Sequence, residues 1–381
     1  MGKSRTGGGI GAAKRAEPNV IAMQGAGHYS ANTVGAKAAI DAAGDLVLDC
    51  LGTMPVADKR FPLGFADYGA ADGGTSIDLW RRVARQVREM APERQMSLCY
   101  TDLPHNDFSA LFQLVHGVLP GHEKSPLGAE PNIFTFASGA SFYRQIFPDA
   151  SLALGFSATA MHWLSHLPGS IAEHTHAVGA SPAEKRVFRK AAESDWETIL
   201  LHRAHELAPG GKLVLVNFCE DDEGRYLGNT GGVNMHDRFA AHWRALWEKR
   251  VITEQEFRRA TFPQYYKTKQ EFTAPLENPS SPVRRAGLKL ENVFTRVTGC
   301  PYAAAFNAKR NPSEFAKVYI PTLRSWSQSP FFGALDSSRP TVERMAILDR
   351  FYAAYEAEVA AAPQGHGMDY VHCFMVVSKS G

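Results

Sequence analysis

The chain has few of the features that mark secreted or nucleic-acid-binding proteins. Its 381 residues include only five cysteines, an odd number at widely separated positions, so we expect neither a disulfide framework nor a Cys-x-x-Cys metal site. The 41 lysines and arginines nearly balance the 39 aspartates and glutamates. A net charge of +2 is too small for a protein that tracks nucleic-acid phosphates. Small-molecule partners are therefore favoured, with no nucleic acid.

Long apolar runs are also missing. No stretch approaches the roughly 18 uninterrupted apolar residues of a membrane span. Residues 1–18 have no apolar segment behind their basic residues, so we expect no secretory leader. The expectation is a cytoplasmic protein without membrane contact, whose Gly-rich and basic residues 1–18 form a flexible tail.

The fingerprints of phosphate-bearing cofactors are absent as well. The Gly-rich stretch 7–14 (GGGIGAAK) follows no predicted strand and does not end in Gly-Lys-Ser/Thr. No GxGxxG motif follows the first predicted strand at 60–68. The sequence therefore does not support binding of NAD(P) or ATP.

What the sequence does contain is an alternation of apolar strands and helical stretches. Strands are predicted over 60–68, 95–102, 132–138, 151–158 and 211–218, and helices over 76–90, 107–118 and 182–207. This alternation predicts a doubly wound α/β fold with a mostly parallel sheet and helices on both faces. Residues 220–285 are polar, aromatic and helical in pattern, which indicates a cap. Strands at 289–297 and 370–379 flank a helical region at 313–361.

Acidic residues stand where two of the predicted strands end. Asp67 and the turn 69–74 follow the first strand, and Asp102 ends the second. Ligands bind beyond the carboxyl ends of the strands in such sheets, and a carboxylate can accept two hydrogen bonds from a ribose. Thr75 or Ser76 is predicted to cap the next helix. These features predict a nucleoside without a pyrophosphate, and S-adenosylmethionine is such a molecule.

Five segments of the chain form a pattern that is typical of one family. They are 23–33 (MQGAGHYSANT), 66–75 (ADYGAADGGT), 101–108 (TDLPHNDF), 140–148 (ASFYRQIFP) and 161–165 (MHWLS). In this order they resemble the motifs of the SABATH methyltransferases, which include carboxyl methyltransferases of salicylate, benzoate, jasmonate and indole-3-acetate and the N-methyltransferases of caffeine synthesis. The resemblance covers about residues 20–380, and the Ala-rich helices are more typical of a bacterial or fungal member than of a plant one.

The resemblance implies a Rossmann-like class I methyltransferase fold with a mainly helical cap, working as a homodimer. It divides the chain into a tail at 1–18, a segment at 19–60 that covers the active site, a cofactor-binding core and a substrate-binding cap. The core consists of 61–219 with 286–308 and 366–381, and the helical cap consists of 220–285 with 309–365.

The resemblance also assigns residues to the cofactor S-adenosylmethionine, whose product is S-adenosylhomocysteine. Asp67 would organise the turn that holds the methionine part, Asp102 would accept hydrogen bonds from the ribose, and Leu103 would pack on the adenine. The other cofactor contacts that we expect are Tyr29, Asn32, Gly69, Asp72, Ser141, Phe142 and Ser157.

On the acceptor side the resemblance assigns the carboxylate to Trp163, whose indole N–H is a donor only. The family's second carboxylate ligand is a glutamine, and the chain has Ala36 at that position. Gln24, Lys37 or His162 are possible replacement donors. Thr159 stands where plant members often carry an aromatic residue, which predicts a wider or more polar pocket.

The expected reaction is methylation of the carboxylate of a small aromatic or apolar acid to its methyl ester. A carboxylate is ionised at pH 7 and needs no general base, in keeping with the lack of an obvious catalytic dyad. Two alternatives stay open: transfer to a ring nitrogen or phenol, with a base such as His162, and a homologue that binds S-adenosylmethionine without catalysis. His162 and His166 share a helix face, but no zincin glutamate follows, so we expect no metal.

Overall fold

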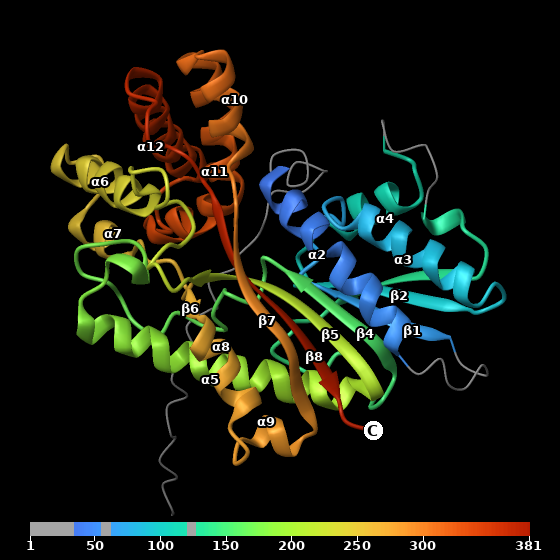
Figure 1. Cartoon of the computed structure of the whole chain (residues 1–381). Coiled ribbons are helices and arrows are strands. Elements are labelled where there is room, and N and C mark those ends of the chain that lie inside the picture. Colours follow the sequence, from blue (N-terminus) through green and yellow to red (C-terminus); the bar gives the residue numbers. More distant parts are fainter. Residues whose placement is uncertain (1–33, 55–61, 120–126) are drawn as a thin grey trace, which may run out of the picture.

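A computed structural model describes residues 34–54, 62–119 and 127–381 of the chain. Its centre is a sheet with the strand order β3-β2-β1-β4-β5-β8-β7, beside which a short β6 pairs with β5 (Figure 1). The strands are β1 (Leu63–Tyr68), β2 (Met96–Asp102), β3 (Ile133–Gly139), β4 (Leu152–Ala158), β5 (Leu207–Glu220), β6 (Lys267–Thr268), β7 (Leu288–Thr298) and β8 (Tyr370–Lys379).

The sheet is parallel from β3 to β5, and only β8 runs antiparallel to its neighbours β5 and β7. Strands β1 and β4 are adjacent although β2 and β3 lie between them in the sequence. The strand order therefore reverses at β1, and a reversal of this kind opens a crevice at the carboxyl ends of the strands. The predicted α/β fold with a mostly parallel sheet is confirmed.

Helices cover both faces of the sheet. On one face lie α2 (Val34–Thr53), α3 (Ile77–Met90) and α4 (Phe108–Val115), and on the other lie α5 (Pro182–Glu206), α8 (Lys269–Glu277) and α9 (Pro282–Arg285) (Figure 1). Helix α3 buries Ile77, Trp80, Ala84 and Val87. Their spacing of three and four residues gives one apolar stripe toward the sheet.

Helix α5 starts where its sequence provides a capping box. The Ser181 side chain accepts a hydrogen bond from the Glu184 backbone, and the Glu184 side chain accepts one from the Ser181 backbone. This reciprocal pair and the proline at the first helical position fix the N-terminus. The described chain also contains two 3₁₀ turns, η1 (Leu127–Ala129) before β3 and η2 (Ala177–Gly179) before α5.

A second layer of helices stands beside the carboxyl ends of the strands. It contains α6 (Met235–Glu248), α7 (Glu254–Arg259), α10 (Pro301–Lys309), α11 (Pro312–Ala334) and α12 (Thr341–Ala361). Its core is aromatic, with Phe239, Trp243, Phe331, Phe351 and Tyr355 fully buried. We call this layer the cap. Helices α8 and α9 pack instead with α5 and the sheet.

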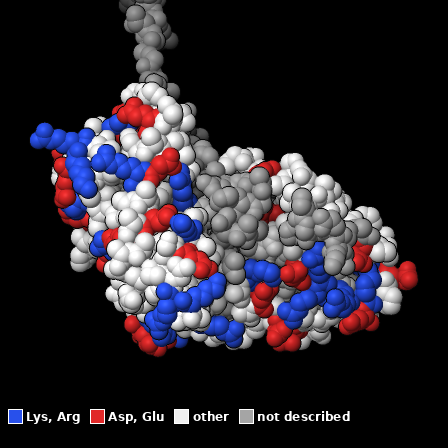
Figure 2. All heavy atoms as spheres, turned by 90° about the horizontal axis from the view of Figure 1, so that it is seen from above, with Lys and Arg blue, Asp and Glu red and all other residues white. Residues whose placement is uncertain are grey.

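The surface carries both signs of charge. Among the described residues on the face seen in Figure 2, lysines and arginines lie next to aspartates and glutamates. Within the ranges that the structure describes, no helix has the length and apolar character that crossing a membrane requires.

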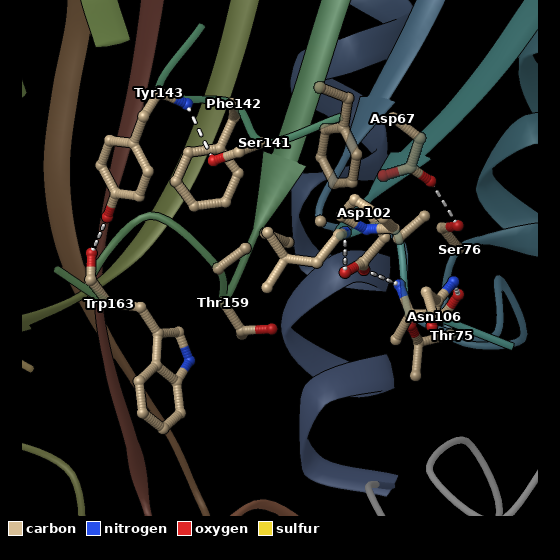
Figure 3. A pocket seen from close by; sticks show the side chains of 18 of the residues that line it. Asp67, Thr75, Ser76, Asp102, Asn106, Ser141, Phe142, Tyr143, Thr159 and Trp163 are labelled. Atoms are coloured by element: carbon tan, nitrogen blue, oxygen red, sulfur yellow. Dashed lines mark hydrogen bonds between the residues drawn. The ribbon is translucent and has the colours of Figure 1, made fainter. Parts of the chain in front are cut away.

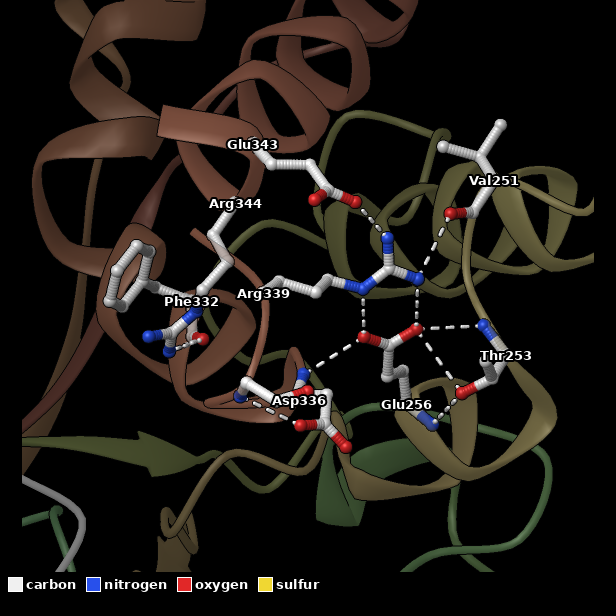
Figure 4. A network of polar contacts seen from close by, with 9 residues as sticks. Val251, Thr253, Glu256, Phe332, Asp336, Arg339, Glu343 and Arg344 are labelled. Atoms are coloured by element: carbon white, nitrogen blue, oxygen red, sulfur yellow. Dashed lines mark hydrogen bonds and ion pairs between the residues drawn. The ribbon is translucent and has the colours of Figure 1, made fainter. Parts of the chain in front are cut away.

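One buried carboxylate joins two parts of the cap (Figure 4). Glu256 on α7 is 1% exposed and accepts hydrogen bonds from Nε and Nη2 of Arg339 at 2.6 and 2.9 Å. It also accepts hydrogen bonds from the backbone N–H groups of Thr253 and Asp336. Burial by itself would raise the pKa of Glu256, but these hydrogen bonds outweigh it and lower the pKa to about 2.

We expect Glu256→Gln to lower the free energy of unfolding by about 2 kcal/mol at pH 7, because the ion pair with Arg339 is lost. The depressed pKa gives the sign of the pH dependence. The stabilisation is complete above the unfolded pKa of about 4.3 and is lost as the pH falls toward 2. Denaturant unfolding of both proteins between pH 7 and pH 3 measures this, and the difference between them should shrink with the pH.

Glu254→Gln is the matched control, because Glu254 lies on the same helix and pairs with Arg258 but is 58% exposed. Its effect should stay below about 0.5 kcal/mol. Equal effects of the two substitutions would contradict a special contribution of Glu256.

Candidate active site

A cavity of about 310 Å³ lies where β1, β2, β3 and β4 end. The strand order of the sheet reverses between β1 and β4, and the cavity lies at the carboxyl ends of these two strands. Its volume falls in the range of small-molecule sites. Figure 3 shows Asp67, Asp102 and Ser76 on one side of the cavity and Phe142, Tyr143 and Trp163 on the other.

Asp67, next to last in β1, holds the start of α3. Its Oδ2 accepts hydrogen bonds from Ser76 Oγ at 2.6 Å and from Trp80 Nε1 at 2.8 Å. Ser76 has the predicted N-cap position, but its side chain bonds to Asp67 and does not cap the helix. Burial raises the pKa of Asp67 to about 6 against the effect of these hydrogen bonds. Its Oδ1 has no hydrogen-bond partner among the described residues and is available to a ligand.

Asp102, at the end of β2, ties two strand ends together. Its Oδ1 accepts the N–H of Leu103 at 2.7 Å, and its Oδ2 accepts the N–H of Ala71 in the turn after β1 at 2.8 Å. Asn106 donates to the carbonyl of the same Ala71. Burial raises the pKa of Asp102 although both backbone hydrogen bonds act to lower it. A carboxylate has about four acceptor positions, so two remain for a ligand.

Gly69 lets the turn after β1 approach the end of β4. Its φ is +76°, and a Cβ at this position would lie 2.4 Å from the Cβ of Ala160. Both the backbone conformation and the close contact therefore require glycine.

The segment after β3 forms the aromatic wall. Ser141, Phe142 and Tyr143 all line the cavity. The rings of Phe142 and Tyr143 have their centroids 4.8 Å apart, and the Tyr143 hydroxyl donates to the backbone carbonyl of Trp163. Trp163 in turn pairs through its backbone with Gln264, which precedes β6.

Thr159 lies between this wall and the acidic side (Figure 3). Its φ of +55° is unusual for a β-branched residue and costs about 1 to 3 kcal/mol. Its N–H donates to Val216, whereas its hydroxyl and the indole N–H of Trp163 have no partner in the described part of the chain. Lysine and arginine are absent from the described residues that line the cavity.

The cavity brings together most of the predicted site. Asp67, Gly69, Asp102, Leu103, Ser141, Phe142 and Trp163 all line it. Thr75, His105 and Asn106 line it as well. Trp80, which bonds to Asp67, was missed by the sequence analysis because its helical spacing indicates only a core residue.

Two residues predicted to contact the cofactor, Ser157 and Asp72, do not line the cavity. Ser157 is fully buried and donates to the carbonyl of Tyr68, because alternate residues of a strand face opposite sides and its neighbours Phe156 and Ala158 take the cavity side. Asp72 accepts the N–H of Gly74 within the turn.

His162 packs on the ring of Phe218 at 4.8 Å, and burial lowers its pKa well below the usual value. It does not line the cavity. Lys37 forms ion pairs with Asp41 and Asp78. Ala36 belongs to the same buried cluster as Trp163. Gln24, Tyr29 and Asn32 lie outside the described residues.

Comparison with known proteins gives matches over most of the chain. Residues 18–282 match the model of a family described as SAM dependent carboxyl methyltransferase. Methyltransferase LUC1 of a Fusarium species is 31% identical over 215 residues, which cover 56% of each protein and so less than two thirds of that relative. Gibberellic acid methyltransferase 2 of Arabidopsis thaliana is 26% identical over 288 residues, covering 68% of this chain and 71% of the relative.

Loganic acid O-methyltransferase of Catharanthus roseus is 25% identical over 282 residues, covering 68% of this chain and 72% of the relative. Among solved structures, a loganic acid methyltransferase with SAH superposes with a TM-score of 0.72 at 20% identity, covering 94% of this chain and 99% of the other. This likeness establishes the fold.

We expect Asp102→Ala to weaken binding of S-adenosylhomocysteine by about 1.5 to 3 kcal/mol, because hydrogen bonds to a charged carboxylate are lost. Calorimetric titration measures the affinity. Asp221→Ala is the matched control, since Asp221 is also buried but lies outside the cavity. Unchanged affinity in folded Asp102→Ala would remove this carboxylate from the binding site.

The raised pKa of Asp67 predicts a pH dependence of the same affinity. A cationic ammonium group binds the ionised carboxylate better, so affinity should be constant above about pH 7 and fall by up to about tenfold per unit below pH 6. Titrations between pH 8 and pH 5 test this. In Asp67→Asn the fall should disappear, and an identical pH profile in the variant would show that another group is responsible.

Proposed function

Because the chain belongs to the family of S-adenosylmethionine-dependent carboxyl methyltransferases, we propose that it converts the carboxylate of a small aromatic or apolar acid to its methyl ester. One observation carries the proposal. A single cavity combines two carboxylates at the ends of β1 and β2, neither of which pairs with a lysine or arginine of the described residues, with the neutral donors Trp163 and Thr159. The carboxylates suit a cationic nucleoside and the neutral donors suit an anionic acceptor.

The residues present fit S-adenosylmethionine. The two spare acceptor positions of Asp102 suit the ribose hydroxyls, and Oδ1 of Asp67 suits the ammonium group. Leu103 and Phe142 offer apolar surface to the adenine. When bound, this cofactor supplies a methyl group on a positively charged sulfur.

The acceptor side would hold a carboxylate without neutralising it. An ion pair with lysine or arginine would stabilise the acceptor oxygen and make it less nucleophilic, and the described lining residues contain neither. The N–H of Trp163 and the hydroxyl of Thr159 are weaker, neutral donors that can orient the carboxylate. The chain's contribution is then alignment and exclusion of water, and alignment alone can supply of order 7–11 kcal/mol.

No observation favours a nitrogen or phenol acceptor. An acceptor of this kind that carries a proton needs a base beside it, and His162, the sequence candidate, is buried against Phe218 outside the cavity. The histidine that does line the cavity, His105, interacts with Asp102 on the side assigned to the cofactor. The hydroxyl of Tyr143 is engaged with the Trp163 carbonyl, and burial raises the pKa of Tyr143 well above its usual value. A carboxylate acceptor needs no such base.

We also propose that the protein works in the cytoplasm as a homodimer. The free thiols of all five cysteines support a reducing compartment. The edge strand β3 exposes Phe134 and Phe136, at 45% and 52%, on one face. Large apolar side chains on an unpaired edge support a contact with a second copy.

The deciding experiment incubates the protein with S-adenosylmethionine and a panel of aromatic and aliphatic acids, phenols and ring nitrogens. We expect release of S-adenosylhomocysteine together with a methyl ester, and only with acids. The rate with an acid should vary little between pH 6.5 and 8.5, because the acceptor is already ionised. Binding of the cofactor without transfer to any acid would overturn the proposal.

The two neutral donors can be tested separately. Trp163→Phe keeps the bulk of the ring but removes its N–H, and we expect kcat/KM for the acid to fall about tenfold to a hundredfold, or 1.4–2.7 kcal/mol. Thr159→Val removes the hydroxyl and keeps the branched shape, and we expect it to lower kcat/KM for the acid as well. Affinity for S-adenosylhomocysteine should not change in either variant.

Trp247→Phe is the control, because Trp247 lies on α6 and stacks on Phe257 away from the cavity. The double variant of Trp163 and Thr159 completes a cycle. Full activity in both single variants would show that the carboxylate binds elsewhere.

A further inference from the structure

The aromatic wall of the cavity belongs to a segment without helix or strand. Residues 140–151 connect β3 to β4 through turns and bends. Within the segment, the Arg144 N–H bonds to the Ser141 carbonyl and the Tyr143 N–H to Ser141 Oγ. Beyond Arg144 the segment contains no helix or strand, and its next hydrogen bonds between backbone groups are those of Ala150 and Ser151 to the carbonyls of His205 and Glu206.

Two side chains of α5 supply what this segment lacks. The guanidinium of Arg203 donates to the carbonyls of Phe142 at 2.9 Å and Arg144 at 2.8 Å. Oε1 of Glu206 accepts the N–H groups of Ile146 at 2.6 Å and Phe147 at 3.2 Å. One helix turn therefore binds both the carbonyls and the N–H groups of the segment.

Arg203 and Glu206 form an ion pair with no exposed surface. Two contacts of 2.7 Å join them, and both side chains are 0% exposed. Tyr68, the last residue of β1, donates its hydroxyl to Glu206, and the guanidinium lies 4.4 Å from the centre of its ring. A buried ion pair is weak evidence for stability, because apolar residues of similar size often do as well. The hydrogen bonds of Arg203 and Glu206 to the backbone of the wall indicate that the pair holds the wall in position.

The position of the aromatic wall affects both sides of the cavity. The Phe142 ring lines the cavity directly. The next residue, Tyr143, donates its hydroxyl to the carbonyl of Trp163. A displacement of the wall would therefore move the aromatic surface for the cofactor and the indole for the acceptor together.

We propose that Arg203 and Glu206 are positioning residues that set the aromatic wall and, through Tyr143, the place of Trp163. The inference rests on the proposed function for its catalytic readout, but its binding readout does not require turnover. Neither residue touches a reacting group, so both act through the backbone they hold.

The test compares Glu206→Gln with Glu256→Gln in the full chain. Both remove the charge of a buried carboxylate that pairs with arginine and accepts two backbone N–H groups, but Glu256 lies in the cap, away from the cavity. We expect Glu206→Gln to raise the Kd of S-adenosylhomocysteine at least tenfold and to lower kcat at least tenfold. Glu256→Gln should change neither by more than about twofold.

Two further variants probe the route through the wall. Tyr143→Phe removes only the bond to the Trp163 carbonyl, so kcat/KM for the acid should fall about fivefold or more while the Kd of S-adenosylhomocysteine stays unchanged. Arg203→Lys keeps the charge but cannot reach both carbonyls, and it should resemble Glu206→Gln. If Glu206→Gln does not fold, Tyr143→Phe and Arg203→Lys decide.

The outcomes distinguish a failure of the proposed function from a failure of the positioning role. If the unaltered protein does not bind S-adenosylhomocysteine, or does not methylate any acid, the proposed function fails. If it does both, and folded Glu206→Gln and Tyr143→Phe behave like the Glu256→Gln control, the positioning role is overturned.

Discussion

Two carboxylates lie at the ends of β1 and β2, Asp67 buried and Asp102 half-buried, and no lysine or arginine of the described residues pairs with them. A buried charge without a cation has to be met by hydrogen-bond donors. Asp67 receives them from the first turn of α3, and Asp102 receives them from the backbone of the turn after β1. The turn, the start of the helix and the ends of both strands are therefore arranged around these two groups. Each carboxylate keeps acceptor positions that a ligand can use.

The contrast with Glu256 shows what such an arrangement means chemically. All three carboxyl groups are buried or nearly so, but Glu256 has Arg339 as a partner and its pKa is lowered to about 2. Burial without a cation raises the pKa of Asp67 to about 6. The first environment stabilises the fold, and the second leaves a group that gains from binding a cation. The presence or absence of an arginine partner thus distinguishes the structural carboxylate of Glu256 from the binding carboxylate of Asp67.

Much of the fold and of the site can be predicted from the sequence, because strand ends and turn residues are local signals. The alternation of strands and helices gives the parallel sheet, and Asp67, Gly69 and Asp102 follow from the strand ends. The sequence says less where the answer depends on which way a side chain faces. Ser157 and Asp72 sit in the right segments, but their side chains bond to the backbone of the protein itself.

Other features leave no sequence signal at all. Arg203 and Glu206, three apart on a helix, have the spacing of an ordinary surface pair, and only the packing of α5 under the β3–β4 connection buries them. The left-handed backbone of Thr159 is equally hidden, since its residue type is unfavourable there. Both depend on contacts between segments that are distant in the chain.

The lack of lysine and arginine in the described lining has a kinetic consequence for the reaction we propose. Before anything binds, Asp67 and Asp102 give the cavity a negative field, which disfavours entry of an anionic acid. A positively charged sulfonium nucleoside reverses that field at the place where the acid must settle. For the reaction we propose, we therefore expect the cation to bind before the anion, with the methyl donor itself as the electrostatic partner of the acid.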